Sequence, residues 1–150
     1  MAASTTVRND PYQHFNFLVE IDGVPRAGFT EVSGMTTDTD PVPYREGADK
    51  GLHTRMLTGL RKHTPIVCKR GWTKDPNLWK WRLDIIRGTV KRRSADIILL
   101  DEQRREVLRW RVSEAWISKW ESSPFNAKTN EVAIESIELV HEGLELVTPS

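Results

Sequence analysis

Apolar and polar residues alternate along several short stretches of the chain, which is the pattern of β-strands with one buried face. In the first of these stretches one face would carry Phe15, Phe17, Val19 and Ile21. The dipeptide Asp22-Gly23 that follows suits the left-handed backbone of a tight hairpin turn. We therefore expect a second strand, at about residues 27–32, to pair with the first.

Later stretches predict further strands. HTPIVCKRGW should contain a strand through Ile66 and Cys68. ADIILL is apolar on both faces, as at the centre of a sandwich, and DEQRRE is a polar turn. The returning strand then places Leu108, Trp110 and Val112 on one face. AWISKWESSPFNAKTN indicates the end of a strand followed by a structured loop.

One segment has the signals of a helix. Asp75 is a suitable N-cap, Pro76 fits the first helical position, and Gly88 lies near the expected end. Apolar residues recur at helical spacing between these signals. We expect the helix to pack on the body of the protein through Trp79, Leu83, Ile86 and Val90.

The stretch NEVAIESIELVHEGLEL, residues 130–146, fits either a helix or a strand. A helix would place five glutamates on one stripe, where neighbouring like charges repel: Glu131, Glu135, Glu138, Glu142 and Glu145. A strand would need a one-residue bulge at Glu135 or Ser136 to bring its apolar residues to one face and most of the glutamates to the other. Periodicity alone does not choose between the two.

Residues 36–62 lose all periodicity and contain Pro41, Pro43, Gly47, Gly51 and Gly59. A segment of this length without structure of its own is unusual inside a compact monomer. We therefore expect an extended arm that is functional or is ordered by a partner. A disordered surface loop is the alternative.

The chain has 150 residues, the size of one domain. One helix among six or seven strands predicts a mainly β fold, an antiparallel sandwich or barrel with one flanking helix. In such a body a strand is favoured for residues 130–146. Residues 1–11 should form a flexible segment without the apolar core of a secretory signal, and no apolar run is long enough to span a bilayer. The lone Cys68 has no intrachain partner, so we expect folding in a reducing cytoplasm.

Charge is unevenly distributed along the chain, although the net charge is only +1. Residues 1–60 carry 5 basic and 8 acidic side chains, residues 61–120 carry 16 and 7, and residues 121–150 carry 1 and 6. A basic middle between acidic ends is typical of a nucleic-acid-binding surface, or of a subunit whose faces are complementary to copies of itself. Solvated charge that merely clusters would give the same counts.

The best argument for nucleic acid is the run of basic residues Lys91, Arg92, Arg93, Arg104, Arg105, Arg109 and Arg111. The aromatic residues among them, Trp110 and Trp116, fall on the expected core face, whereas base stacking needs exposed aromatics. The six tryptophans are better explained by the core and by protein interfaces.

Catalytic and metal-binding patterns are absent from the sequence. The four histidines, His14, His53, His63 and His141, are not spaced with Cys or carboxylates as metal ligands. No phosphate-binding loop, nucleophile elbow or metalloprotease helix occurs. Cys68 lies in a predicted strand, where a small buried hydrophobe is commoner than a nucleophile. We expect no enzymatic activity, no cofactor and no metal.

Five stretches carry a family resemblance: FLVEIDGVPRAGFTEVSGM, YREGADK, CKRGWTKDPNLWKW, ADIILLDEQRREVLRW and PFNAKTNEVAIESIELVHEGLEL. In this order they resemble the tail tube proteins of contractile phage tails and of phage-tail-like contractile injection systems. The resemblance covers nearly all of residues 12–147. The chain departs from the family at RMLTGLRKHTPIV, where a Leu-Pro-Gly turn is common, and at the arginine-rich turn of residues 103–106, where a glycine is usual.

The resemblance implies a β-sandwich or barrel with one flanking helix, six copies in a ring, and rings stacked into a hollow tube inside a contractile sheath. The implied partners are other copies of the chain, the sheath protein, a baseplate hub or spike adaptor, a tail terminator or cap, and a cargo or tape-measure protein in the lumen. Assembly would occur in the bacterial cytoplasm, and the particle would be a virion tail or an injection system that conducts DNA or protein.

Two sets of residues are candidate assembly sites on this basis. The arm should reach a neighbouring subunit through Tyr44, Arg45, Glu46, Gly47, Leu57, Gly59 and Arg61. An acidic face of the last strand should line the bore or meet an adjacent chain through Glu131, Glu135, Glu138 and Glu142. The alternatives are a baseplate adaptor with the same fold, which would join tube to spike, and a basic nucleic-acid-binding module.

Overall fold

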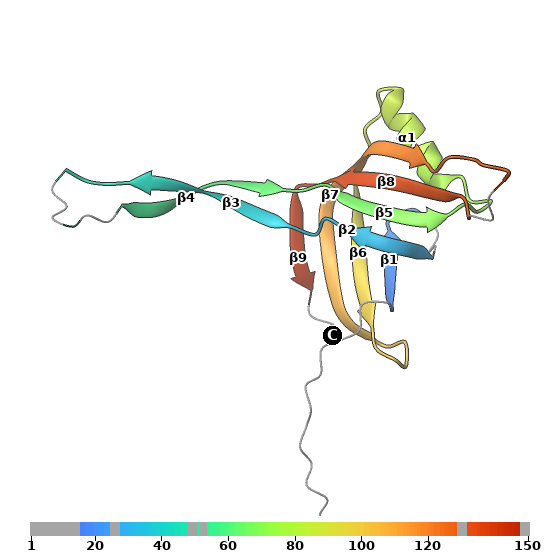
Figure 1. The fold of residues 1–150 in the computed structure, drawn as a ribbon, viewed down its shortest axis with the longest axis horizontal. Coiled ribbons are helices and arrows are strands. Elements are labelled where there is room, and N and C mark those ends of the chain that lie inside the picture. Colours follow the sequence, from blue (N-terminus) through green and yellow to red (C-terminus); the bar gives the residue numbers. More distant parts are fainter. Residues whose placement is uncertain (1–15, 25–27, 48–50, 52–53, 129–131, 148–150) are drawn as a thin grey trace, which may run out of the picture.

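The computed structural model describes residues 16–24, 28–47, 51, 54–128 and 132–147 (Figure 1). These residues form nine strands and one helix: β1 (Phe17–Ile21), β2 (Phe29–Ser33), β3 (Thr37–Tyr44), β4 (Arg55–His63), β5 (Ile66–Gly71), α1 (Asn77–Ile86), β6 (Arg93–Leu100), β7 (Glu106–Ser122), β8 (Ile134–Val140) and β9 (Gly143–Val147). Seven strands form the body, and β3 and β4 form a separate two-stranded sheet.

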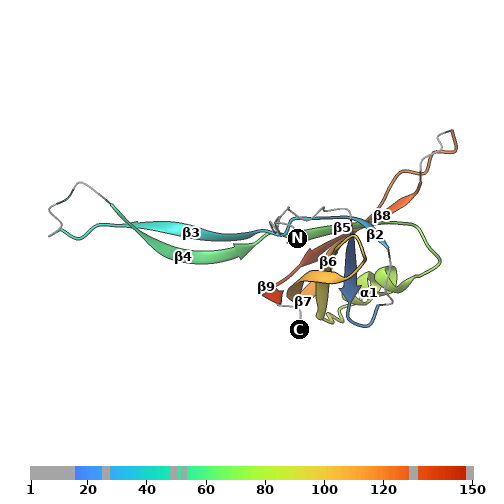
Figure 2. The same cartoon turned by 90° about the horizontal axis from the view of Figure 1, so that it is seen from below.

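The body consists of two antiparallel layers that share β7. In one layer β1 pairs with β6, and the first part of β7 pairs with β6 and β9. In the other layer β2 pairs with β5, β5 with β8, and β8 with the second part of β7. Figure 2 shows the two layers from the side. The predicted antiparallel β fold with one flanking helix is confirmed.

The strand β7 passes from one layer to the other at a sharp bend. Glu114 has a positive φ of 53°, and the register against β6 shifts at this level. The neighbouring chain is interrupted at the same level of β7. The strand β8 ends opposite Trp116, and β9 begins opposite Ser113. A bulge with a left-handed residue bends a strand. Both strands therefore turn together, and they close this side of the sandwich.

The hydrophobic core fills the space between the layers. Its buried residues come from β1, β5, β6, β7, β8 and α1, and the fully buried members include Ile66, Leu78, Val112, Ile117, Ile137 and Leu139. Trp110, Trp116 and Trp120 pack against this cluster while staying partly exposed. Trp110 and Trp116 thus lie against the core, as the sequence predicted, and Trp120 joins them.

The predicted hairpin between the first two strands is wrong. A turn does form at Asp22-Gly23, where Gly23 has a φ of 77° and Val24 N donates to the carbonyl of Ile21. However, β1 pairs with β6 and β2 pairs with β5 in the other layer. A local turn signal shows where the chain reverses, but it does not show which strand will be the partner.

The terminal segment is a strand, as the fold class favoured, but it differs from the predicted strand in two ways. It is divided into β8 and β9 by the break at His141 and Glu142. The predicted bulge at Glu135 or Ser136 is absent, because β8 pairs residue for residue with β5 from Ile134 to Leu139. Glu135 therefore lies on the buried face of β8 with Ile137 and Leu139.

The helix α1 begins and ends close to the predicted signals. The helix begins at Asn77 with Pro76 as its N-cap, one residue later than the predicted N-cap at Asp75. The Asp75 carboxylate still accepts a hydrogen bond of 3.0 Å from the backbone N–H of Asn77. At the other end Gly88 has a φ of 95°, and the N–H groups of Gly88 and Thr89 donate to Ile85 and Asp84. This pair of bonds is the Schellman arrangement that ends many helices at glycine. In the described part of the chain, no helix has the length and apolar character needed to cross a membrane.

The predicted packing face of α1 is wrong. The buried residues are Leu78 and Trp81, whereas Trp79 and Ile86 are 41% and 57% exposed. Leu83 is half-buried, and Val90 lies beyond the helix and is exposed. The helix lies against the second part of β7, beyond the residues that pair with β6. Arg82 donates to the Ile117 carbonyl there at 3.1 Å. The helix thus packs through the adjacent stripe, which contains Leu78 and Trp81, and not through the predicted one.

The segment expected to be an extended arm forms the hairpin of β3 and β4. It has secondary structure of its own, since the two strands pair from Thr37 and His63 to Tyr44 and Arg55. Figure 1 shows it projecting far from the body on one side. Among the described strands, β3 and β4 pair only with each other. We refer to β3, β4 and their connection as the arm.

Candidate assembly surfaces

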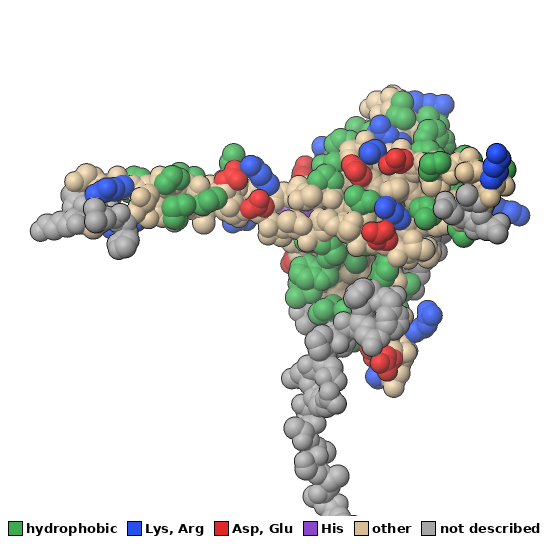
Figure 3. Space-filling view, in the orientation of Figure 1, with side chains coloured by type: hydrophobic (Ala, Val, Ile, Leu, Met, Phe, Trp, Pro, Cys, Tyr) green, Lys and Arg blue, Asp and Glu red, His purple; other side chains and the backbone are tan. Residues whose placement is uncertain are grey.

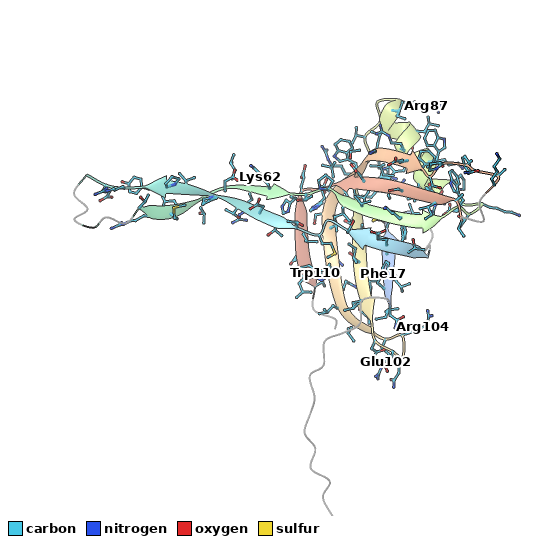
Figure 4. All side chains as sticks on the ribbon, in the orientation of Figure 1. Phe17, Lys62, Arg87, Glu102, Arg104 and Trp110 are labelled. Atoms are coloured by element: carbon cyan, nitrogen blue, oxygen red, sulfur yellow. The ribbon has the colours of Figure 1, made fainter. Side chains whose placement is uncertain are left out.

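The arm exposes apolar side chains on both of its faces. Cross-strand partners point to the same side of a sheet, so one face carries Val42, Tyr44 and Leu57, and the other carries Pro41, Pro43 and Met56. The large hydrophobic residues on both faces are exposed. Figure 3 shows hydrophobic atoms along the arm, and Figure 4 shows side chains on both sides of its ribbon. A ribbon that is apolar on both faces has no core of its own, so it needs partner surfaces to cover it.

The residues that the sequence assigned to an inter-subunit contact all lie on the arm. Tyr44, Arg45, Glu46 and Gly47 follow one another at the end of β3, and Tyr44 donates to the Glu46 carboxylate at 3.1 Å. Leu57 and Arg61 are exposed on β4. Gly59 has a role within the arm, because a Cβ there would lie 2.7 Å from the Asp40 carbonyl oxygen at the bulge between the strands.

A pair of histidines lies where the arm joins the body. His63 ends β4, and His141 occupies the break between β8 and β9; their ring centroids are 4.9 Å apart. His141 Nδ1 lies 3.2 Å from the Gly143 carbonyl oxygen. Burial, and next the neighbouring His63, hold the pKa of His141 below its ordinary value. The sequence alone does not indicate this pair, because the two residues are far apart in the chain.

Acidification is expected to destabilise the folded chain through His141. Because the pKa of His141 is lowered in the folded state, the unfolded chain takes up this proton first, near the ordinary histidine pKa of about 6.5. The contribution is neutral above that pH, and stability is lost as the pH falls below it. Thermal melts between about pH 8 and pH 5 should show a smaller fall in Tm for H141Q than for the wild type. Equal pH responses of H141Q and the wild type would contradict this assignment.

A buried ion pair connects β5, β7 and β8. Arg70 is completely buried, and its Nε donates to Glu135 Oε2 at 3.1 Å. Its other nitrogens donate to the side chain and the carbonyl of Asp75. The second oxygen of Glu135 accepts from Trp120 Nε1 at 2.8 Å. Glu135 is therefore an internal anchor between β5, β7 and β8.

The four glutamates predicted to form one acidic face do not do so. Glu135 is buried in the ion pair with Arg70, because the absence of a bulge turns it inward. Glu138 lies on the opposite face of β8 and is half-buried. Glu142 is exposed at the break before β9 and lies 3.9 Å from Arg92. Glu131 lies outside the described residues. The prediction is wrong for Glu135, and Glu138 and Glu142 remain candidates for an assembly surface.

An aromatic cluster is exposed at the end of the body opposite the arm. Trp120 meets Trp72 and Trp79 edge to face, with centroids 5.6 and 4.9 Å apart, and Phe125 lies 6.4 Å from Trp72. Trp72, Trp79 and Trp120 line a hollow of about 310 Å³ that also includes Asp75 and Glu135. We call Trp72, Trp79, Trp120, Phe125 and the neighbouring Val132 the aromatic end.

The sequence profile of the T4-like virus tail tube protein gp19 family matches residues 13–145. The chain belongs to this tail tube protein family. Among curated protein sequences none matches it significantly. The family resemblance predicted from the sequence motifs is confirmed, and the chain is a structural subunit of a contractile tail or injection system.

Solved structures share the fold of this tail tube protein. A chain of the sheath–tube complex of the extracellular contractile injection system PVC, in the extended state, has a TM-score of 0.84 and 23% identity, covering 99% of this chain and 100% of that one. A chain of the anti-feeding prophage cap has a TM-score of 0.82 and 24% identity, covering 98% and 100%. Hcp1 from Flavobacterium johnsoniae is more distant, with a TM-score of 0.62 and 12% identity over 90% and 97%.

Internal contacts engage much of the basic middle of the tail tube protein. Arg109 is paired with Glu20, Asp96 and Glu106, and Arg111 also pairs with Asp96. Arg93 donates to the Asp22 carbonyl and lies over the Trp81 ring, and Arg105 pairs with Asp101. Paired arginines of this kind do not form a continuous surface for phosphate groups. The arginines that best supported nucleic-acid binding are therefore engaged within the chain.

The described side chains also offer little for metal binding or nucleophilic chemistry. Among the described residues no group of three or more His, Cys, Asp or Glu side chains could hold a metal ion. Cys68 is buried in β5, and burial raises its pKa to about 12. A thiol in this state is a poor nucleophile.

Proposed function

We propose that six copies of this tail tube protein close into a ring and that the rings stack into the hollow inner tube of a contractile particle. The match to the tail tube family over most of the chain is the observation that carries this proposal. The exposed arm supports it, because a contact that repeats around a closed symmetry axis gives a ring, and one that repeats along the axis gives a filament.

The proposed role requires no catalysis and no cofactor. The tube acts through its geometry, as a conduit for DNA or protein inside the sheath. The sheath, the baseplate hub or spike adaptor, and the terminator or cap are the proposed partners. Structures of similar fold come from a sheath–tube complex, a baseplate and a cap, which supports this set. A cargo or tape-measure protein in the lumen, and assembly in the bacterial cytoplasm, complete the proposal.

Glu131, Glu138 and Glu142 are proposed to face the bore or an adjacent chain. Glu142 is exposed, and Glu138 lies on the outer face of β8. Glu131 precedes them in the chain. Cryo-electron microscopy of the purified protein is expected to show stacked six-fold rings with Glu138 and Glu142 on one of these two surfaces. A sample that stays monomeric at every concentration contradicts the tube, and single rings that never stack favour the adaptor.

Removing two apolar side chains from the arm is expected to weaken assembly strongly. Met56 and Leu57 are exposed on opposite faces of the arm, so M56S/L57S should leave the monomer folded. Burying a large apolar side chain contributes about 1.5–3 kcal/mol, so the loss of both should raise the concentration required for tubes by at least about tenfold. Sedimentation and negative-stain microscopy measure this change. I86S, at a similarly exposed position outside the arm, is the control and should assemble normally; tubes of M56S/L57S at the wild-type concentration refute the role of the arm.

A further inference from the structure

Exposed hydrophobic side chains gather at the two ends of the long axis of the molecule. Five lie on the arm: Val42, Tyr44, Met56, Leu57 and Leu60. Four lie at the aromatic end: Trp72, Trp79, Phe125 and Val132. Outside these two groups the large exposed hydrophobics of the described chain are Ile86, Val90 and Leu146. Figures 1 and 2 both place the arm on one side of the body and the loops after β5 and β7 on the other.

The aromatic end is a preformed surface. Trp120 is fixed by its hydrogen bond to Glu135, which the buried Arg70 holds in turn. The Trp72 and Trp79 rings both contact it, at interplanar angles of 77° and 61°, and the three rings line the 310 Å³ hollow. Beside it a second hollow of about 390 Å³ is lined by Phe125, Val132 and Ile134. A rigid aromatic surface loses little conformational entropy when it binds a partner.

The arm has the shape and chemistry to fill such hollows. Its face with Pro41, Pro43 and Met56 combines two rigid rings with a flexible thioether. Methionine sulfur makes favourable contacts with aromatic rings and adapts to irregular space. The arm projects away from the body, so it does not reach the aromatic end of its own chain (Figure 1).

The symmetry of the two surfaces indicates how they meet. Contact of two arms, or of two aromatic ends, would be isologous and would leave the other surface uncovered on both chains. Contact of an arm with an aromatic end uses each surface once per chain. Repeated from chain to chain, this head-to-tail contact leaves neither surface exposed in a closed or continuous assembly.

We propose that the aromatic end of one tail tube subunit receives the Pro41, Pro43 and Met56 face of the arm of a second copy. This inference rests on the proposed function, because it identifies the surface that the arm contacts within the tube. Met56 lies against the walls formed by Trp72 and Trp79, and Phe125 closes over the arm from the β7–β8 loop.

Site-specific crosslinking between two chains tests the contact. One preparation carries M56C and the other carries F125C; these positions are 60% and 78% exposed, so both chains should fold. Cys68 can stay, because it is 1% exposed and burial raises its pKa to about 12. After the chains are mixed and assembled, a short bismaleimide should give a dimer band that neither preparation gives alone. A chain with both substitutions should give a ladder of multimers.

L146C is the matched control, since Leu146 is 48% exposed on β9 and lies outside both surfaces. M56C should crosslink to F125C and not to L146C. If tubes assemble and M56C fails to crosslink to F125C, or crosslinks to L146C equally well, the receiving surface is wrong while the tube function stands. If neither the wild type nor any variant assembles, the proposed function fails and this inference fails with it.

Discussion

Replacing Arg70 by methionine is expected to lower the free energy of unfolding by about 3–5 kcal/mol, because it leaves a buried carboxylate without its cation. Glu135 is only 3% exposed, and Arg70 Nε is its charged partner at 3.1 Å. The same substitution removes both hydrogen bonds from Arg70 to Asp75 and its contact with the Phe29 ring at 5.8 Å. Chemical denaturation of the R70M monomer measures the loss.

Two further variants separate the charge from the volume of the side chain. R70M/E135M removes both charges and keeps apolar volume, so it should recover most of the lost stability, as replaced buried ion pairs often do. K69M removes the neighbouring cation on the other face of β5, whose pair with Glu31 is exposed and 3.7 Å long. Exposed pairs contribute about 0–1 kcal/mol, so K69M should be nearly neutral. A loss for R70M no larger than that for K69M contradicts the structural role of the pair.

Trp81 is expected to be the second most costly single position, with W81A lowering the free energy of unfolding by about 3–5 kcal/mol. The Trp81 ring is 1% exposed and lies under the Arg93 guanidinium at 5.0 Å. Its Nε1 donates to the Lys91 carbonyl at 2.9 Å, so it also fixes the chain that leaves the helix. W81F keeps most of the apolar area and loses that hydrogen bond, which should cost about 1 kcal/mol.

The neighbouring tryptophan of α1 provides the control. Trp79 is on the exposed side of the helix, so W79A should destabilise the monomer much less than W81A. A larger loss for W79A than for W81A would show that the helix packs through the stripe that the sequence predicted, and equal losses would contradict the difference in burial between the two residues. Because Trp79 belongs to the aromatic end, its substitution should instead affect assembly.

The helix illustrates what can be predicted from local sequence. Its limits depend on Asp75, Pro76 and Gly88, which act on the backbone within a few residues, and the structure places them as predicted to within one residue. Its buried face could not be predicted in this way. Six of the ten residues of NLWKWRLDII are apolar, and they lie both on the stripe with Leu78 and Trp81 and on the stripe with Trp79 and Ile86. Only the position of β7 distinguishes the two stripes.

Contacts between distant residues explain the other errors. Glu135 looked like an exposed carboxylate because its partner, Arg70, is 65 residues away in the chain. The first two strands looked like a hairpin because the strands that pair with them, β6 and β5, come later. His63 and His141 meet only through the same long-range folding. Each of these features requires the tertiary structure.

The sequence marked the arm as a distinct segment but did not predict its secondary structure. The missing periodicity, the prolines and the glycines marked residues 36–62 as an arm. They did not show a hairpin, because Pro41 and Pro43 count against a central strand and are compatible only with an edge. The aromatic end was not predicted at all, since its members come from four separate parts of the chain.

The two prolines of β3 have a consequence for the protein before it is incorporated into a tube. Proline lacks an N–H group, and residues two apart in a strand direct their backbone groups to the same side. Pro41 and Pro43 therefore remove two successive donors from one margin of the arm, where a passing chain could otherwise add as a further strand. A free subunit should therefore be less prone to edge-to-edge aggregation along this margin.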